Sequence, residues 1–250
     1  MPAQAGRSPA VTERRKLLAG LAGAAALIAA RQAQAFLPWH EEAFPEAAAA
    51  VEALKKHAFI TGLMDGTLSP DAFLWYLRQN LHYLAGFEKS LLTLSARLPG
   101  KDDREQLLLW ARETAGTAEW TRSLIKEFSV SEEDGRFSSL RRTAALYIGW
   151  EKEASEKLPL SAAWAALLPC FWVYGELGKF VAEHRRPDSR YAPWLAAYGD
   201  PAYDATVARA TALADRLSQQ ETGKRREAVD AFLKSVNFEI ALWDAAVALE

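Results

Sequence analysis

The sequence predicts an all-α protein built as a single bundle of about seven or eight helices, in which ligand sites normally lie between facing helices. Three observations support this fold class. Apolar residues recur at steps of three and four, short breakers containing Pro or Gly separate these stretches, and 50% of the 250 residues are hydrophobic. No strand-like alternation competes with the helical spacing, and the length suits one large domain with a substantial core.

Residues 1–35 are expected to be a targeting segment, and residues 36–250 the folded domain. The basic run Arg14-Arg15-Lys16 is followed by the uncharged stretch 17–30, and Ala33-Gln34-Ala35 forms an A-x-A cleavage site. The stretch is shorter than the run of about 20 residues that spans a bilayer, and adjacent arginines are typical of twin-arginine export. We therefore expect a periplasmic or otherwise extracytoplasmic protein with no stable membrane span after cleavage. The alternative is an amphipathic or buried first helix.

The first helix of the folded domain is expected to begin at Pro45, because proline is tolerated at the first helical position. Apolar side chains then recur with helical spacing at Val51, Leu54 and Phe59. The next helix is expected to begin after Ser69 and to run to about Leu98, where Pro99-Gly100 stops it. Further helices are expected over about 103–128, 138–157, 161–184, 201–220 and 223–248, with breakers between them.

The charge pattern excludes several classes of function. Thirty Lys and Arg against 32 Asp and Glu leave a formal charge of −2, and no basic block follows the N-terminal region, so nucleic-acid binding is not expected. The sequence contains no Gly-rich phosphate-binding loop and no Gly-x-Ser-x-Gly elbow. Metal binding is not expected either, because no Glu-x-x-His pair accompanies the scattered His40, His57, His82 and His184.

A polar amide interrupts an aromatic stripe on the helix that follows Ser69. Steps of three and four place four side chains on one face of this helix: Tyr76, Asn80, Tyr83 and Phe87. Such a position suits a residue that binds a ligand between helices. The alternative is a core amide that hydrogen-bonds to a neighbouring backbone group.

The only cysteine of the chain, Cys170, lies on the helix expected from Ser161, on one face with Tyr174 and Leu177. Pro169 precedes it within the helical run, where a proline removes a backbone hydrogen bond and bends the helix. One cysteine forms no intramolecular disulfide, and a free thiol in an oxidising compartment must be buried or used. The alternative is an inert cysteine that packs as a small hydrophobe.

The last helix carries a carboxylate, Glu239, on or beside an apolar stripe that includes Phe232, Leu242 and Trp243. A carboxyl among apolar neighbours has a raised pKa, which suits a general acid working near neutral pH. The alternative is that Glu239 is solvated or forms a salt bridge at the margin of the stripe.

Taken together, these segments resemble the thiaminase II (TenA) family over nearly all of residues 36–250. The blocks that match its motifs are His57-Ala58-Phe59-Ile60-Thr61-Gly62 with Asp65-Gly66-Thr67-Leu68, Gln79-Asn80-Leu81-His82-Tyr83-Leu84, Leu167-Leu168-Pro169-Cys170-Phe171-Trp172-Val173-Tyr174, and Ser235-Val236-Asn237-Phe238-Glu239 through Trp243. The third block resembles the nucleophile segment of the family almost letter for letter.

The resemblance implies a haem-oxygenase-like helical bundle, usually a tetramer, without a metal or organic cofactor. It implies hydrolysis at the carbon attached to position 5 of an aminopyrimidine, with Cys170 as nucleophile and Glu239 as the acid that protonates a ring nitrogen. The same resemblance makes Tyr83 the ring that stacks on the pyrimidine. The remaining residues that it implies for the substrate pocket are Asn80, Tyr147, Tyr174 and Tyr198.

Departures from the family pattern keep other functions open. Asn80 replaces the pocket aspartate, and a neutral amide forms hydrogen bonds but accepts no proton. Phe238 replaces a tyrosine and Ala58 a proline, and export is unexpected for a family that mostly works in the cytoplasm. We expect an exported hydrolase of thiamin or thiamin-derived aminopyrimidines, acting in salvage. The alternatives are a non-catalytic pyrimidine-binding protein and a related hydrolase of another small amine or amide.

Overall fold

The computed structural model describes residues 38–129, 135–184, 186 and 188–250, and within them the chain is helical with no strand. The all-α prediction is therefore confirmed, while the expected signal segment 1–35 lies outside the described residues. The helices are α2 (His40–Lys55), α3 (Ala58–Asp65), α4 (Pro70–Arg97), α5 (Lys101–Phe128), α6 (Arg142–Lys157), α7 (Leu160–Leu167), α8 (Pro169–His184), α9 (Ala192–Tyr198), α10 (Pro201–Gln220) and α11 (Arg225–Ala248).

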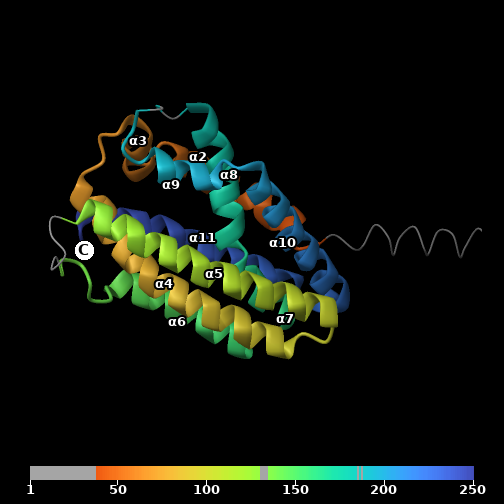
Figure 1. The fold of residues 1–250 in the computed structure, drawn as a ribbon. Coiled ribbons are helices and arrows are strands. Elements are labelled where there is room, and N and C mark those ends of the chain that lie inside the picture. Colours follow the sequence, from red (N-terminus) through yellow and green to blue (C-terminus); the bar gives the residue numbers. More distant parts are fainter. Residues whose placement is uncertain (1–37, 130–134, 185, 187) are drawn as a thin grey trace, which may run out of the picture. The chain divides into compact units, whose positions relative to one another are not determined.

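The two longest helices, α4 and α5, lie side by side and run in opposite directions (Figure 1). Helix α6 packs against α4, and α7 packs against both α6 and α11, so that these helices enclose the core. Helix α8 crosses the direction of α4 and α5, and the short helices α3 and α9 contact each other at one end of the bundle (Figure 1).

Aromatic side chains fill the core. The tryptophans Trp39, Trp75, Trp110, Trp164 and Trp243 are all at most 1% exposed. The rings of Trp110 and Trp164 stack with centroids 5.4 Å apart, which ties α5 to α7. The run Leu160–His184 is long and apolar enough to cross a membrane, but 83% of its most apolar window is buried inside the protein, as in a core helix of a bundle.

The helix count exceeds the expected seven or eight because short elements appear where breakers were expected. His57 caps α3 through its side chain, which accepts a hydrogen bond from the backbone N–H of Phe59 at 3.1 Å. Gly66 ends α3 with a φ of 75°, a conformation that favours glycine. Helix α9 begins at Ala192, because the Pro193 beside it suits a first turn.

The predicted start of the first helix at Pro45 is wrong, since α2 begins at His40 and contains Pro45. Ala43 and Ala47 are both buried, so the inward face continues across the proline. Proline removes one hydrogen bond, the one to the carbonyl of Glu41, and Glu41 is exposed to solvent. The proline is tolerated here because water is available to the carbonyl that it frees.

At Pro169, where a bend was expected, α7 and α8 are separated by a single residue, Leu168, whose backbone keeps helical dihedral angles. The backbone N–H of Leu168 closes α7 on the carbonyl of Trp164 at 2.9 Å, and Pro169 is the first residue of α8. A proline at a helix start leaves no hydrogen bond unmade, because the first N–H groups of a helix have no partner inside it. The interruption places Cys170 in the first turn of α8.

Candidate active site

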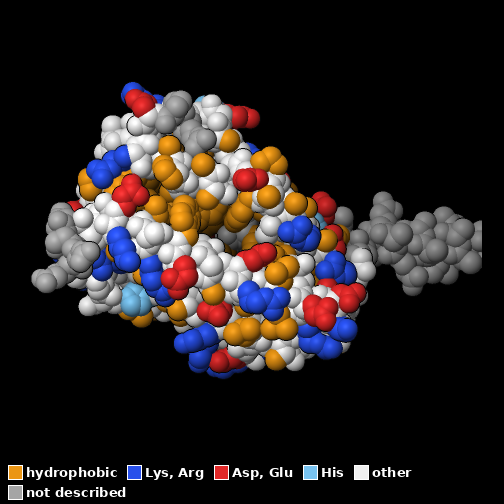
Figure 2. Space-filling model, in the orientation of Figure 1, with side chains coloured by type: hydrophobic (Ala, Val, Ile, Leu, Met, Phe, Trp, Pro, Cys, Tyr) orange, Lys and Arg blue, Asp and Glu red, His pale blue; other side chains and the backbone are white. Residues whose placement is uncertain are grey.

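A cavity of about 230 Å³ lies among α4, α5, α8 and α10, with the end of α9 at its wall. The space-filling view shows a hollow with hydrophobic side chains around it near the middle of this face (Figure 2). Five of the predicted site residues line the cavity, namely Asn80, Tyr83, Cys170, Tyr174 and Tyr198. The two other predicted residues, Tyr147 and Glu239, lie behind this wall and reach it through hydrogen bonds.

Cys170 stands at the cavity wall and is half-buried, so it is not sealed in the core. Burial raises the pKa of its thiol well above the ordinary value, the charges of Glu239 and Glu151 add to that effect, and a hydrogen bond with Tyr83 opposes it. The first turn of a helix also favours a thiolate through its positive end. Burial is the largest of the effects on the pKa, and we conclude that the thiol is protonated at rest.

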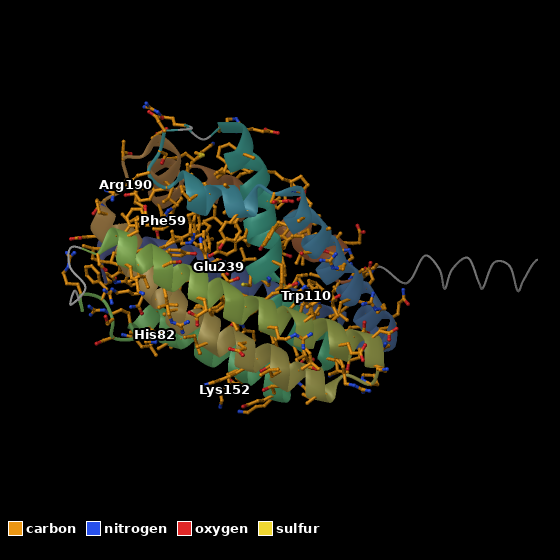
Figure 3. The ribbon with its side chains drawn as sticks, viewed as in Figure 1. Phe59, His82, Trp110, Lys152, Arg190 and Glu239 are labelled. Carbon is orange, nitrogen blue, oxygen red and sulfur yellow. The ribbon has the colours of Figure 1, made fainter. Side chains whose placement is uncertain are left out.

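Glu239 lies on α11 and is 1% exposed. Its Oε1 accepts a hydrogen bond from the hydroxyl of Tyr147 at 3.0 Å, and its Oε2 accepts one from the hydroxyl of Tyr174 at 3.3 Å. Burial raises the pKa of the carboxyl to about 7, although both tyrosines act to lower it. Figure 3 labels Glu239 in the interior, between Phe59 and Trp110. A carboxyl with this pKa exchanges protons near neutral pH, as its apolar neighbours in the sequence predicted. The alternative, a solvated or salt-bridged Glu239 at the margin of the apolar stripe, does not fit a side chain that is buried with two tyrosine donors.

The tyrosines form a continuous polar lining within an aromatic wall. The hydroxyls of Tyr76 and Tyr174 lie 3.0 Å apart, and the ring of Tyr174 lies 4.9 Å from that of Tyr198. Tyr83 and Tyr147 also face each other, with ring centroids 4.9 Å apart. Burial raises the pKa of each of these phenols, so each carries its proton and acts as a hydrogen-bond donor near neutral pH.

Two departures noted in the sequence have clear positions. Asn80 is 6% exposed on the cavity wall, one turn of α4 before Tyr83 and Leu84. It therefore faces the ligand space and is not an internal core amide. Phe238 lies behind Tyr147, with its ring stacked on the tyrosine at 5.2 Å. Its missing hydroxyl removes no contact of Glu239 with Tyr147 or Tyr174.

Sequence reasoning missed two side chains of this region. Tyr203 on α10 lines the cavity, and its hydroxyl donates to the backbone carbonyl of Cys170 at 3.3 Å. Glu151 on α6 is completely buried, and its Oε1 accepts a hydrogen bond from the Tyr83 hydroxyl at 2.9 Å. The spacing of three and four from Ala144 through Tyr147 to Glu151 places Glu151 on an inward face, and that pattern was available in the sequence.

Within the described part of the chain, no group of three or more His, Cys, Asp or Glu side chains is placed to hold a metal ion. The seven predicted site residues gather in one region from α4, α6, α8, α9 and α11. The arrangement combines a thiol, a carboxyl that titrates near neutrality and several phenol donors around a space with aromatic walls. It suits the binding of a flat, polar ring and proton transfer to that ring.

Comparison with known families matches residues 45–248 to the model of the TENA/THI-4/PQQC family. The chain belongs to this family. The resemblance to TenA proteins that the sequence motifs indicated is thereby confirmed. The family match covers every one of the predicted site residues, from Asn80 to Glu239.

Relatives within the TENA/THI-4/PQQC family are moderately similar. The thiamine biosynthesis multifunctional protein ThiED of Corynebacterium efficiens is 28% identical over 190 residues, which cover 75% of this chain and 25% of the relative. The chain thus spans about a quarter of that relative's length. The aminopyrimidine aminohydrolase of Bacillus subtilis is 28% identical over 195 residues, which cover 76% of this chain and 81% of the relative.

Solved structures show the same fold. A TenA homologue from P. horikoshii OT3 superposes with a TM-score of 0.76 at 23% identity, covering 85% of this chain and 99% of the homologue. A domain with a heme oxygenase-like fold from Shewanella denitrificans OS217 gives a TM-score of 0.65 at 16% identity, covering 82% and 90%. The haem-oxygenase-like bundle implied by the sequence is therefore confirmed.

Proposed function

We propose that this protein is a cysteine-dependent hydrolase of thiamin or of aminopyrimidines derived from it. The observation that carries the proposal is a thiol, Cys170, on the wall of one tyrosine-lined cavity, together with a carboxyl with a pKa of about 7, Glu239, which lies behind that wall and accepts a hydrogen bond from the lining residue Tyr174. The two groups are close enough that the charge of Glu239 raises the pKa of the Cys170 thiol. This proximity supports the proposal that a nucleophile and an acid act on one ring.

The cavity suits an aminopyrimidine for physical reasons. Its walls are aromatic, and Tyr83 presents a ring beside the thiol on which a flat heterocycle stacks. The Tyr198 hydroxyl and the Asn80 amide offer hydrogen bonds to ring nitrogens and to an amino group. Two relatives at 28% and 23% identity carry the name aminopyrimidine aminohydrolase, which supports this choice of substrate.

The proposed reaction balances as a hydrolysis. The Cys170 thiol gives its proton to the leaving amine, or to water when thiazole is the leaving group, and its sulfur bonds to a ring carbon while Glu239 gives its proton to a ring nitrogen. The bond between the exocyclic methylene and the leaving nitrogen breaks, and the amine or thiazole leaves with the electron pair. Water adds to the methylene, the carbon–sulfur bond breaks with its electron pair on sulfur, the proton that the water loses restores the thiol, and the ring nitrogen returns its proton to Glu239. The products are the hydroxymethyl-pyrimidine and the released amine or thiazole.

The charge of the cavity lining favours substrates without phosphate. Polar side chains from α5 and α10 contribute to the lining, among them Glu113, Thr114, Thr117 and Thr206. Of the described residues that line the cavity, none is Lys, Arg or His, while Glu113 is acidic. A lining of this charge attracts a cationic or neutral leaving group and repels a phosphate.

Asn80 motivates a second candidate, a related hydrolase of another small amine or amide, or a pyrimidine-binding protein without turnover. An amide on the cavity wall donates hydrogen bonds as well as accepting them, so it suits ligands that a carboxylate does not bind.

Product analysis separates these functions. The protein is incubated with thiamin, with the aminomethyl-pyrimidine and with other small primary amines, and products are identified by chromatography and mass spectrometry. Hydroxymethyl-pyrimidine is expected, and binding without any product contradicts the hydrolase.

We also propose that the protein is exported and forms a homo-oligomer, a tetramer by family resemblance. Export rests on the sequence of residues 1–35, and N-terminal sequencing of the mature protein tests it, with Phe36 expected as first residue. Intact Met1 in cytoplasmic protein contradicts export.

The proposed assembly rests on exposed apolar side chains. Leu92, Leu140 and Leu146 are 42%, 46% and 53% exposed, which suits contacts between copies of the chain. Sedimentation equilibrium measures the number of subunits, and a monomer contradicts the proposal.

A further inference from the structure

We propose that Glu113 is a specificity-determining residue of the cavity, and that with Thr114 and Thr117 it forms a subsite on α5 for a primary amine. These three residues are called the amine subsite below. The assignment rests on the proposed function in one respect, since it places the leaving group of the pyrimidine at the amine subsite. The supply of hydrogen-bond donors and acceptors around the cavity belongs to the structure whatever the substrate.

Helix α5 presents one largely polar face to the cavity. Four lining residues stand at helical spacing on this face: Trp110, Glu113, Thr114 and Thr117. The ring centroid of Trp110 lies 5.1 Å from that of Phe171, the residue that follows Cys170. Glu113 and Thr114 are one helical turn farther along α5, and Thr117 is two turns farther. The amine subsite therefore begins beside the segment that carries the thiol and extends away from it.

The threonine hydroxyls of the lining donate their protons within their own helices. Thr114 donates to the carbonyl of Trp110 at 2.8 Å, and Thr117 donates to the carbonyl of Glu113 at 3.1 Å. On α10, Thr206 also donates to a backbone carbonyl of its own helix, at 3.3 Å. A threonine hydroxyl has one proton and keeps its lone pairs, so each of these oxygens meets a ligand as an acceptor.

Most of the tyrosine hydroxyls of the lining are committed in the same way. Each donates to an acceptor of the protein: Tyr83 to Glu151, Tyr174 to Glu239, and Tyr203 to the carbonyl of Cys170. The indole N–H of Trp110 is buried away from the cavity surface. Among the described lining residues, the donors left for a ligand are the Tyr198 hydroxyl and the amide of Asn80, which is 6% exposed. Acceptors therefore outnumber donors on the cavity surface.

Glu113 adds a negative charge to this excess of acceptors. Its side chain is exposed and forms no ion pair or hydrogen bond with the described residues. A primary amine brings two N–H donors as the free base and three as the ammonium ion, and the ammonium form prevails near neutral pH, as it does for lysine. Both the charge and the number of donors therefore match an amine better than an alcohol.

The amine subsite separates the proposed substrate from its product. Hydrolysis replaces the amine on the exocyclic methylene with a hydroxyl, which has one donor and no charge. The carboxylate of Glu113 thus loses its charged partner when the amine leaves, and the product binds less tightly than the substrate. Glu113 favours both the capture of the amine and the release of the alcohol.

Calorimetric binding measurements test the assignment in a Cys170→Ser background, which prevents turnover. The ligands are the aminomethyl-pyrimidine and the hydroxymethyl-pyrimidine, which differ only in the amine and the hydroxyl. We expect Glu113→Gln to weaken binding of the amine by about fivefold, the upper range for an exposed ion pair, and to leave binding of the alcohol unchanged. Glu127→Gln is the control, because Glu127 is exposed on the same helix and lies outside the cavity lining.

Three results of this comparison overturn the proposal. In the first, E113Q weakens both ligands equally, as a purely structural role would produce. In the second, E113Q weakens neither ligand. In the third, E127Q weakens the amine as much as E113Q does. Salt provides a further check: raising the ionic strength from about 20 mM to about 500 mM should reduce the effect of E113Q to less than about twofold, because salt screens an exposed charge. An effect that does not depend on salt contradicts the role of the charge.

A second pair of ligands separates the amine subsite from the proposed function. If neither pyrimidine binds, the proposed function fails, and the same measurements are made with benzylamine and benzyl alcohol, which require no recognition of a pyrimidine. We expect benzylamine to bind more tightly than benzyl alcohol and E113Q to weaken benzylamine alone, again by about fivefold. Equal affinity for the two ligands, or no binding of either, overturns the amine subsite.

Discussion

The hydroxyl of Tyr147 donates a hydrogen bond to Oε1 of Glu239 at 3.0 Å, although the two residues are 92 positions apart in the chain. This contact joins α6 to α11 beside the cavity and leaves Glu239 with two phenol donors and no cation. The pKa of about 7 follows from that balance, since burial raises it and the phenols restrain it. The chemistry of the site therefore depends on how tyrosines are distributed around one carboxyl.

Replacing Tyr174, the second hydrogen-bond donor to Glu239, should shift the pH profile of kcat/KM to higher pH. Tyr174→Phe removes the hydroxyl that donates to Oε2 of Glu239 at 3.3 Å, and that hydroxyl lowers the pKa of Glu239. Its loss raises the pKa, and a hydrogen bond worth about 1 kcal/mol corresponds to a rise of somewhat less than one pH unit. The alkaline limb of kcat/KM should shift to higher pH by about that amount. An unchanged limb with a lower rate would show that Tyr174 only binds substrate.

Glu239 should cost stability at alkaline pH. Its pKa is about 7 in the folded protein against an ordinary value of 4.5, so the folded state binds more protons between these pH values and stability falls as the pH rises through them. The full cost, about 3 kcal/mol at about 1.4 kcal/mol for each pH unit by which the pKa moves, is present above the folded pKa and absent below the unfolded one.

Glu239→Gln tests this cost through denaturant unfolding at pH about 5 and about 8. Relative to wild type, the free energy of unfolding of E239Q should improve by about 2–3 kcal/mol between the lower and the higher pH. The altered hydrogen bonds of the amide change the free energy of unfolding equally at both pH values, because the amide does not titrate, so their effect cancels in the comparison. An equal difference at both pH values would mean that the pKa of Glu239 is not raised.

Asn80→Asp should increase activity toward an aminopyrimidine. The side chain lies on the cavity wall at 6% exposure, where a carboxylate accepts a proton or a strong hydrogen bond from an amino group and the amide does not accept a proton. We expect kcat/KM for the aminomethyl-pyrimidine to rise by about tenfold. A fall for the pyrimidine, together with a fall for another amine that the wild type hydrolyses, would show that Asn80 is matched to that other substrate.

Gly178→Ala should displace Tyr198 from the cavity wall, although Gly178 itself does not line the cavity. A Cβ at Gly178 would meet the backbone carbonyl of Tyr198, and backbone cannot move aside as a flexible side chain does. We expect a loss of about 2 kcal/mol or more of stability and a weaker substrate affinity as Tyr198 leaves the cavity wall. Gly116→Ala is the control, since nothing lies within 4 Å of its added Cβ and alanine favours a helix. Equal stability of the two variants would contradict the close packing of α8 on α9.

Much of the site could be predicted because its residues sit in sequence blocks with helical spacing. Cys170 and Tyr174 are one turn apart on α8, and Asn80 and Tyr83 are adjacent on one face of α4. Pro169 indicated the interruption of the helix beside the thiol, since proline removes a backbone hydrogen bond from a helix interior. These features follow from local geometry, which a sequence records directly.

Other features depended on packing between distant segments. Lys152 and Glu153 directly follow Glu151 and are exposed, so its charged neighbours in the sequence suggest a solvated helix. Its burial is decided by α4 and α11, which cover that face of α6. The start of α2 before Pro45 was missed for a similar reason, because the tertiary burial of Ala43 outweighs the local preference of proline.

The most direct test of the central claim compares wild-type protein with Cys170→Ser on the aminomethyl-pyrimidine, measuring ligand binding by calorimetry and product release by chromatography. We expect both proteins to bind the ligand and only the wild type to release hydroxymethyl-pyrimidine, because the serine hydroxyl is a far weaker nucleophile than the thiol. Serine keeps the size of the side chain, so loss of fold does not confound the result. Turnover by the serine variant at the wild-type rate would contradict a role for Cys170, and binding without turnover by both proteins would contradict the hydrolase.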